Sequence, residues 1–382
     1  MIKLLQGDCL QTMKTLADNS VDAIVSDPPY GISFMAKKWD YDVPSVEVWK
    51  EAMRVLKPGG HALIACGTRT QHRMVVNIED AGFEIRDVVS WIYGSGFPKS
   101  LNISKAIDKA AGVEREVVGS ETTCFRMANP RIGNALNSTQ AGDTRETDDA
   151  GYIKRDITAP ATEAAKQWDG WGTALKPACE FFTLARKPLS EKTVAANVLK
   201  WGTGGINVDG CRVATEDQLS IGSNSGGLYE GGLKGEQNGQ HAQGRFPANL
   251  IHDGSQEVLD LFPETKTGKV TKSSSKGMWG TGANTSYNDP NGGGAVARFF
   301  YCAKASKKDR DEGNNHPTVK PTALMQYLCR LITPAGGTVL DPYMGSGSTG
   351  KAAMKEGFSC VGCELDPEYY EIAKTRINNE IK

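Results

Sequence analysis

The chain has 382 residues, of which 39% are hydrophobic, and its formal net charge at pH 7 is −1. This length exceeds the size at which one hydrophobic core usually stops growing, so we expect a main domain with a second unit or a large insertion. The N-terminus lacks the features of a signal peptide and no apolar run reaches the roughly eighteen residues of a membrane span, which predicts a cytoplasmic protein without a membrane partner. The near-neutral charge excludes no class of partner, because a nucleic-acid enzyme can concentrate its positive charge on one face.

The N-terminal part of the chain alternates short apolar runs with segments of helical periodicity. The runs predict strands at 2–8, 21–27, 61–67 and 88–94, and the periodic segments predict helices at 46–56 and 69–83. "KPGG" at 57–60 indicates the end of a helix followed by a turn. Such alternation predicts an α/β fold with a mostly parallel sheet and helices on both faces.

The pattern changes between about 97 and 297. Gly, Ser, Asn and Thr become frequent there and regular periodicity fades, as in "SIGSNSGGLYEGGLKGEQNGQ". A stretch of this kind is either a disordered linker or a loop-rich domain that orders on a partner. Within it, "ACEFFTLARKP" at 178–188 is compatible with a strand, near 180–187, that returns to the main sheet.

The α/β pattern resumes toward the C-terminus. "ALMQYLCRLI" predicts a helix, "GTVLDPYMGSGSTG" a strand with a Gly-rich turn and a helix start, "SCVGCEL" a strand, and "PEYYEIAKTRINNEI" a closing helix. We therefore expect the sheet to be built from both ends of the chain, with the loop-rich region inserted between them.

The cysteines do not predict a metal site. Nine are scattered along the chain, and only Cys360 and Cys363, in "CVGC", have the spacing of a metal or redox pair. A zinc site would need a second pair or nearby histidines, and the apolar context reads as a buried strand in which cysteine acts as a small hydrophobe.

A cofactor site is predicted at the glycine-rich turn. The strand that ends in Asp341 is followed by Gly345 and Gly347, where backbone can approach a ligand that a Cβ would block. The next strand ends in Glu364, about twenty residues later, where an acidic group typically accepts ribose hydroxyls. This spacing predicts a nucleoside ligand, and the alternative is an ordinary strand turn with a solvated Glu.

"DPPY", formed by Asp27, Pro28, Pro29 and Tyr30, follows the predicted strand at 21–27. Taken alone it is compatible with a helix cap and a turn. However, prolines donate no backbone hydrogen bond, so their carbonyls and the Asp27 carboxylate offer a rigid row of acceptors beside the Tyr30 ring. An amino group on an aromatic ring would fit this row.

Two further motifs complete the set, "GDCL" at 7–10 and "HPTVKP" at 316–321. With "DPPY" and "DPYMGSGSTG" they resemble the motifs of the S-adenosylmethionine-dependent DNA amino-methyltransferases, over residues 1 to about 95 and about 298 to 382. The order resembles the β-type arrangement of that family, in which the catalytic half precedes the target-recognition region and the cofactor half closes the chain.

The resemblance implies a Rossmann-like methyltransferase sheet in three parts: a catalytic half at 1–96, an inserted target-recognition region at 97–297 and a cofactor-binding half at 298–382. It implies S-adenosylmethionine as the cofactor and double-stranded DNA as the substrate, with the target base turned out of the duplex at a cost of a few kcal/mol. The resemblance is also compatible with a homodimer. It is compatible as well with a cognate restriction endonuclease as a partner in a restriction–modification system.

Residue roles follow from the same resemblance. The target base would be held by Asp27, Pro28, Pro29 and Tyr30. The cofactor would contact the ribose acid Glu364, the adenine-facing pair Asp8 and Cys9, the methionine-end residues Thr318 and Lys320, and the turn residues Asp341, Pro342, Gly345, Ser346 and Gly347.

The amino group that is methylated would be either N6 of adenine or N4 of cytosine. By the same resemblance, Asp at the first position of the tetrad is common in adenine enzymes and Ser in cytosine enzymes, so Asp27 favours adenine. An RNA or protein amide methyltransferase, and a DNA-binding relative without turnover, are the remaining alternatives.

Overall fold

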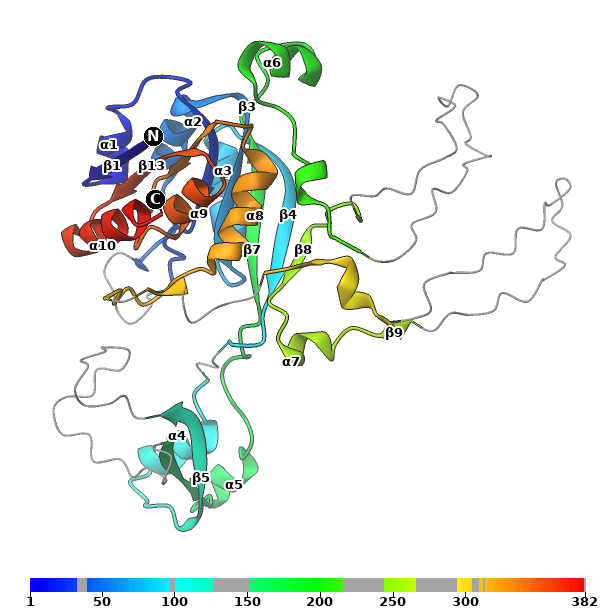
Figure 1. Cartoon of the computed structure of the whole chain (residues 1–382). Coiled ribbons are helices and arrows are strands. Elements are labelled where there is room, and N and C mark those ends of the chain that lie inside the picture. The colour runs from blue at the N-terminus through cyan, green and yellow to red at the C-terminus, as the bar shows by residue number, and fades with distance from the viewer. Residues whose placement is uncertain are drawn as a thin grey trace, which may run out of the picture. The chain divides into compact units, whose positions relative to one another are not determined.

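The computed structural model describes residues 1–32, 40–96, 100–126, 152–215, 244–265, 294–303, 309–311 and 313–380 (Figure 1). Much of the expected insertion therefore lies outside the described residues. The chain divides into two compact units. The first comprises 1–94, 179–314 and 319–382, and the second comprises 95–178 with 315–318.

The first unit is built on a nine-stranded sheet. From one edge to the other its strands are β1 (Ile2–Gln6), β13 (Ser359–Glu364), β12 (Thr338–Asp341), β2 (Val21–Ser26), β3 (Leu56–Gly67), β7 (Cys179–Arg186), β4 (Glu84–Ile92), β8 (Leu250–His252) and β11 (Tyr301–Cys302). Strands from the two ends of the chain are neighbours, as the blue β1 beside the red-brown β13 shows in Figure 1.

The sheet is mostly parallel. Only β7 runs antiparallel to its neighbours β3 and β4, and it lies between them. Parallel pairing links β1, β13, β12, β2 and β3 without interruption. The prediction of an α/β fold with a mostly parallel sheet drawn from both chain ends is confirmed.

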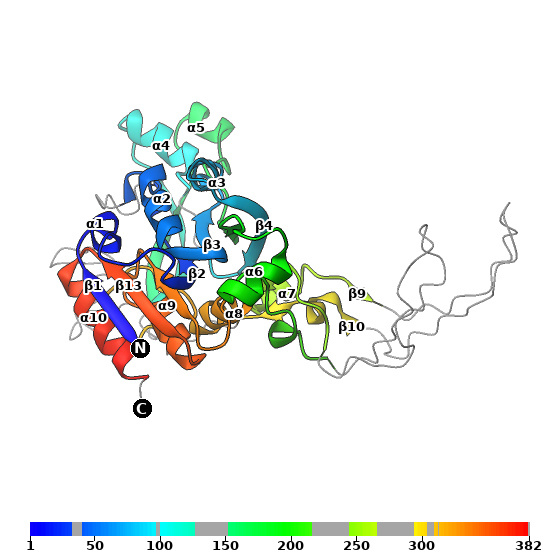
Figure 2. The same ribbon diagram turned by 90° about the horizontal axis from the view of Figure 1, so that it is seen from above.

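Helices cover both faces of this sheet (Figure 2). One face carries α1 (Cys9–Met13), α2 (Val46–Val55) and α3 (Gln71–Asp80), and the other carries α8 (Thr322–Ile332), α9 (Ser348–Lys355) and α10 (Pro367–Asn378). Successive strand residues point to opposite faces, so Ile24 packs with Trp49 of α2, whereas Val25 packs with Leu328 of α8. The two faces thus form two separate hydrophobic cores.

The first unit also contains several short elements between β7 and α8 in the chain. They are α6 (Val194–Trp201), the 3₁₀ turns η3 (Asp209–Cys211) and η4 (Val296–Phe299), α7 (Gln256–Leu259), and the short pair β9 (Glu264–Thr265) and β10 (Gly294–Ala295). Residues 179–314, including the strand β7, group with the first unit. β7 hydrogen-bonds between two strands of the main sheet, at the place where the sequence allowed for a strand near 180–187 to return.

The structure shows where two short sequence motifs lie, "KPGG" at 57–60 and "CVGC" at 360–363. "KPGG" is not a turn outside the sheet but a bulge within β3: Leu56 pairs with Val21, and His61 already pairs with Ala23. Gly59 has φ +76° at this bulge, a conformation that favours glycine. The pair of "CVGC" lies on β13 with Cys360 in one core and Cys363 in the other, because strand positions three apart face opposite sides.

The second unit is a small α/β module. It contains α4 (Ile103–Ala110), an antiparallel pair of β5 (Val117–Arg126) and β6 (Tyr152–Thr158), and α5 (Glu163–Gln167). Its centre is the buried Asp108 carboxylate, which accepts hydrogen bonds from Arg115 at 3.0 Å and from the hydroxyl of Thr162 at 2.8 Å. The salt bridge with Arg115 therefore links α4 to the loop before β5, and the hydrogen bond from Thr162 links α4 to the start of α5.

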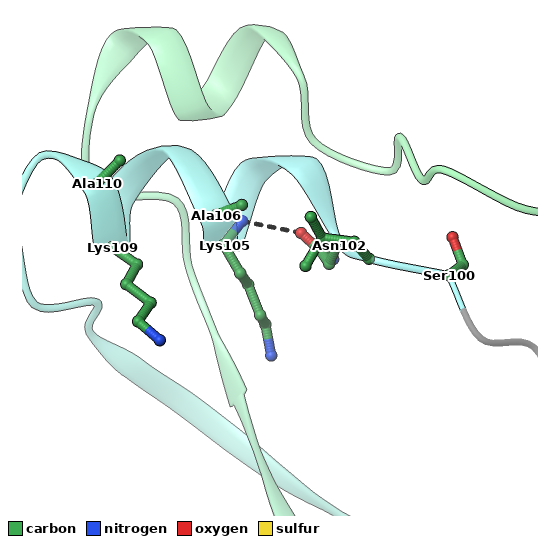
Figure 3. Close-up of a pocket in the computed structure, with 7 residues that line it drawn as sticks. Ser100, Asn102, Lys105, Ala106, Lys109 and Ala110 are labelled. Carbon is green, nitrogen blue, oxygen red and sulfur yellow. Dashed lines mark hydrogen bonds between the residues drawn. The ribbon is translucent and has the colours of Figure 1, made fainter. Parts of the chain in front are cut away.

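The exposed side of α4 borders an open hollow of about 570 Å³. Figure 3 shows the side chains of Lys105 and Lys109 leaving the helix on the same side, one turn apart, beside Asn102, whose side chain caps the helix. Among the described residues, no helix has the length and apolar character needed to span a membrane.

Candidate active site

Four acidic residues lie at the carboxyl edge of the sheet. Asp8 follows β1, Glu364 ends β13, Asp341 ends β12 and Asp27 follows β2. These strands are immediate neighbours and all parallel, so their carboxyl ends meet at one edge. The structure thus brings together acidic residues from both ends of the chain.

The centre of this edge is the switch point of the fold. From β2 the chain continues to β3 on one side, and from β12 it continues to β13 on the other, through helices on opposite faces. Open α/β sheets bind their ligands in the crevice at such a point. Ser26 donates a 2.6 Å hydrogen bond to Oδ1 of Asp341 across it, and both side chains are buried.

The glycine turn lies directly after β12. Gly345 and Gly347 have φ of +52° and +83°. A Cβ at Gly347 would stand 3.0 Å from Cα of Ala373 in α10, so this position needs glycine both for its conformation and for close packing. The N–H of Gly345 donates to Oε2 of Glu364 at 2.8 Å, which fixes the turn against the end of β13.

Burial shapes the acidity of the two carboxyls at this turn. It raises the pKa of Glu364 to about 7, although backbone N–H groups of Asp366 and Gly345 stabilise the anion. Burial also raises the pKa of Asp341 to about 6, against the opposing hydrogen bonds from Ser26 and Thr349. Both groups consequently titrate near neutral pH, where a ligand that donates hydrogen bonds would favour their ionised forms.

The "DPPY" segment forms a second cluster on the other side of the switch point. The hydroxyl of Tyr30 lies 2.7 Å from Oδ1 of Asp27 and 3.1 Å from Oε2 of Glu180, a residue of β7. Lys320 Nζ lies 2.8 Å from Oδ2 of Asp27, 3.0 Å from Glu180 and 3.1 Å from the Tyr30 hydroxyl. Two carboxylates, one ammonium and one phenol therefore share one small volume.

The charges of this cluster depend on one another. Burial opposes the charge on Lys320, yet the pKa of its ammonium is raised, because Asp27 and Glu180 stabilise the cation. Burial and the same two carboxylates raise the pKa of Tyr30, so its hydroxyl stays protonated. Only 10% of the Lys320 side chain, 18% of Glu180 and 22% of Asp27 is exposed, so these interactions are weakly screened by solvent.

Sequence reasoning missed several residues of this cluster. Glu180 was part of a predicted strand without a role, although an acid inside an apolar strand is a usable signal. Tyr93, just after β4, places its hydroxyl 3.4 Å from Oε1 of Glu180. Asp40 accepts the N–H groups of Tyr30 and Gly31 at 2.7 and 3.0 Å and so fixes the backbone after the tetrad. No sequence motif marked these last two.

The other predicted residues have the following positions. Asp8 caps α1 by accepting the N–H of Gln11 at 3.1 Å. Burial raises the pKa of Cys9 to about 11, so its thiol is protonated at neutral pH. Ser346 accepts a 2.9 Å hydrogen bond from Arg376 of α10. Pro28 and Pro342 are buried and Pro29 is half-buried, whereas Thr318 is exposed and belongs to the second unit.

The fold is an open α/β sheet, and the site places hydrogen-bond acceptor groups on both sides of its switch point. The chain belongs to the DNA methylase family of N6 and N4 amino-methylating enzymes. The model of this family matches residues 21–111 and 234–375, more than half of the chain.

Curated relatives match over a shorter stretch. The type II methyltransferase M.ScaI of Streptomyces caespitosus is 33% identical over 85 residues, which are 22% of this chain and 28% of that protein. The type II methyltransferase M2.DpnII of Streptococcus pneumoniae is 36% identical over 87 residues, 23% of this chain and 32% of that protein. The matched part thus spans about a third of these relatives.

Solved structures with low sequence identity to this chain align over nearly its whole length. The alignment with the M1.HpyAVI–SAM complex covers 99% of this chain and 100% of the M1.HpyAVI chain. The sequence identity is 16% and the TM-score is 0.43. The PvuII DNA methyltransferase is described as cytosine-N4-specific. Its alignment covers 98% of this chain and 86% of the PvuII chain, with 14% sequence identity and a TM-score of 0.45.

Proposed function

We propose that this protein transfers the methyl group of S-adenosylmethionine to the exocyclic N6 amino group of an adenine that is turned out of double-stranded DNA. One observation carries the proposal: the Asp27 end of β2 and the Asp341 end of β12 are adjacent, and Ser26 links them. A site for an amino group and a site for a nucleoside cofactor then meet at one switch point. Family membership supports the same chemistry.

The residues present fit the proposed cofactor. Glu364 offers a buried carboxylate suited to ribose hydroxyls, Asp8 and Cys9 stand at the end of the neighbouring strand, and the turn at Gly345 and Gly347 presents backbone to a ligand. When bound, the cofactor supplies a methyl group that its sulfonium has already activated. The chain's task is therefore alignment and acceptance of a proton.

Asp27 is the residue proposed to orient the amino group. Each carboxylate oxygen can accept two hydrogen bonds, so Asp27 retains acceptor capacity beside Tyr30 and Lys320. A hydrogen bond from the amino group to Asp27, and a second to the Pro28 carbonyl, favours a pyramidal nitrogen with a usable lone pair. The Tyr30 ring, fixed by its hydroxyl, is proposed to stack on the base, with a gain of about 1–3 kcal/mol.

DNA contact is proposed for the second unit. Lys105 and Lys109 are exposed on one side of α4 (Figure 3), and Trp168 and Trp171 are 40% and 60% exposed. Lysines on one helix face can contact phosphates without reading sequence, and exposed aromatic rings can stack on bases. A homodimer, a cognate restriction endonuclease and a cytoplasmic location remain predictions.

A labelled-methyl assay tests the function. The purified protein is incubated with duplex DNA and methyl-labelled S-adenosylmethionine, and the digested DNA is analysed by nucleoside mass spectrometry. N6-methyladenine is the expected product. N4-methylcytosine would replace the adenine proposal by the cytosine alternative, and label transfer to RNA or protein but not to DNA would contradict both.

A further inference from the structure

Three oxygen atoms of the DPPY cluster form a row at hydrogen-bonding distances, with the Tyr30 hydroxyl in the middle. Oδ1 of Asp27, the hydroxyl oxygen of Tyr30 and Oε2 of Glu180 follow one another at 2.7 and 3.1 Å. Two oxygen–oxygen contacts of this length require two protons to be hydrogen bonds. With both carboxylates ionised, the Tyr30 hydroxyl supplies only one, and it can donate to only one neighbour at a time.

The charge of the cluster indicates the same deficit. Lys320 is the ammonium shared by the two carboxylates, at 2.8 and 3.0 Å. One positive and two negative charges leave a net charge of −1 in a mostly buried volume. An added proton would neutralise this charge and complete the second hydrogen bond.

We propose that Glu180 receives, through the Tyr30 hydroxyl, the proton that methyl transfer removes from the amino group. This inference rests on the proposed function. It adds an acceptor on β7 to a site otherwise formed by the two ends of the chain, and it assigns the hydroxyl of Tyr30 a role distinct from that of its ring. Glu180 acts through Tyr30 and need not touch the base.

The atoms balance in three steps. The nitrogen–carbon bond forms as the carbon–sulfur bond breaks, with its electron pair left on sulfur, and the nitrogen gives one proton to Asp27. Asp27 then passes that proton to the Tyr30 oxygen while the hydroxyl proton of Tyr30 moves to Oε2 of Glu180. Asp27 is again a carboxylate beside Lys320, Tyr30 is neutral, and Glu180 is a neutral acid that later loses its proton to solvent.

The surroundings of Glu180 bear on its pH dependence. Tyr30 approaches from the end of β2, Lys320 from the segment before α8, and Tyr93 from the end of β4. The thiols of Cys66 on β3 and Cys179 on β7 are also near enough to interact with its charge. Lys320 is the only cation among these facing groups of the described chain, and it contacts both Glu180 and Asp27.

Single-turnover methyl transfer measured against pH tests the relay. The proteins are the wild type, Glu180→Gln, Tyr30→Phe and the double variant, with Glu371→Gln on the exposed side of α10 as the matched control. We expect Glu180→Gln to slow transfer about ten- to hundredfold near neutral pH, to leave cofactor affinity unchanged, and to lose much of its deficit at higher pH, where solvent accepts the proton. Glu180→Asp should restore part of the rate.

The double variant distinguishes a relay from a structural role. If Tyr30 and Glu180 act in one path, removing both slows transfer no more than the slower single variant. Three outcomes would overturn the relay but not the methyltransferase function. They are a double variant whose loss of rate equals the product of the two single losses, a loss of rate in Glu180→Gln that does not change with pH, and a wild-type rate in Glu180→Gln. A wild type that transfers no methyl group to any DNA would defeat the proposed function, and the relay with it.

Discussion

The hydroxyl of Ser26 donates a 2.6 Å hydrogen bond to Oδ1 of Asp341, which lies 315 residues later in the chain. The same carboxylate oxygen accepts the N–H of Tyr343 at 3.1 Å. Asp341 therefore links the end of β2, where "DPPY" begins, to the turn that leads to Gly345. Because both partners are buried, the bond fixes the distance between the two halves of the candidate site.

Replacing Asp27 with alanine should abolish methyl transfer and leave cofactor binding nearly intact. The substitution removes the acceptor proposed for the amino group, whereas the turn at Gly345 and the Glu364 carboxylate are unchanged. Transfer of labelled methyl groups and calorimetric titration with S-adenosylhomocysteine measure the two effects. Asp80→Ala, at an exposed position of α3, is the control for losing a carboxylate. Substantial methylation by the Asp27 variant would contradict its assignment.

Gly347→Ala should destabilise the protein beyond the usual cost of a residue with positive φ. Gly347 and Gly357 have nearly equal φ, +83° and +79°, but a Cβ at Gly347 would meet Ala373 at 3.0 Å, whereas none of the described atoms lies within 4 Å of a Cβ at Gly357. We expect Gly357→Ala to cost about 1 kcal/mol and Gly347→Ala about 1–3 kcal/mol more. Urea unfolding without ligand measures both, and equal losses would refute the packing argument.

The parts of the fold that sequence predicted well are those in which local pattern and burial agree. The apolar run ending at Ser26 forms β2, and the helical period at 46–56 forms α2 over Val46–Val55. The site's acidic residues could be placed together because parallel strands share one carboxyl edge, so Asp27 and Asp341 had to lie near each other once the sheet was inferred.

The rest depends on pairings that no local pattern encodes. Glu180 reaches the cluster only because β7 inserts antiparallel between β3 and β4, and the sequence of β7 does not specify its neighbours. Lys320 was expected at the methionine end of the cofactor, and its ion pair with Asp27 follows from how the segment before α8 passes the end of β2. Such tertiary contacts are decided by packing rather than by spacing along the chain.

Replacing both Lys105 and Lys109 with alanine should weaken DNA binding without changing the cofactor affinity. Each lysine that contacts a phosphate contributes about one unit to the slope of log affinity against log salt, so the slope should fall by up to about two. Fluorescence anisotropy with a labelled duplex at several salt concentrations measures this change. Lys374→Ala, on α10, is the control. An unchanged salt slope in the double variant would exclude this face of α4 as a DNA contact.

The raised pKa of Glu364 predicts how folding stability depends on pH. Its value of about 7 exceeds the ordinary 4.5, so between these values the folded state holds a proton that the unfolded chain has released. The contribution of this group to stability is therefore full below pH 4.5 and is lost as the pH rises through 7. Urea unfolding of the ligand-free protein across this range should show the decline, and Glu364→Ala should lessen it.

Cofactor binding should have the opposite pH dependence. In the proposed site, ribose hydroxyls donate to the ionised Glu364, so binding would first remove the proton that burial retains on this carboxyl below pH 7. The affinity for S-adenosylhomocysteine should thus weaken as the pH falls from 7 to 6, by at most about tenfold per unit. Calorimetry in buffers of different ionisation enthalpy should show proton release on binding. In Glu364→Gln the affinity should be lower and should depend less on pH between 7 and 6, because only the titration of Asp341, whose pKa is raised to about 6, then contributes at this turn. A wild type that binds equally well at both pH values without releasing a proton would show that Glu364 does not hold the ribose.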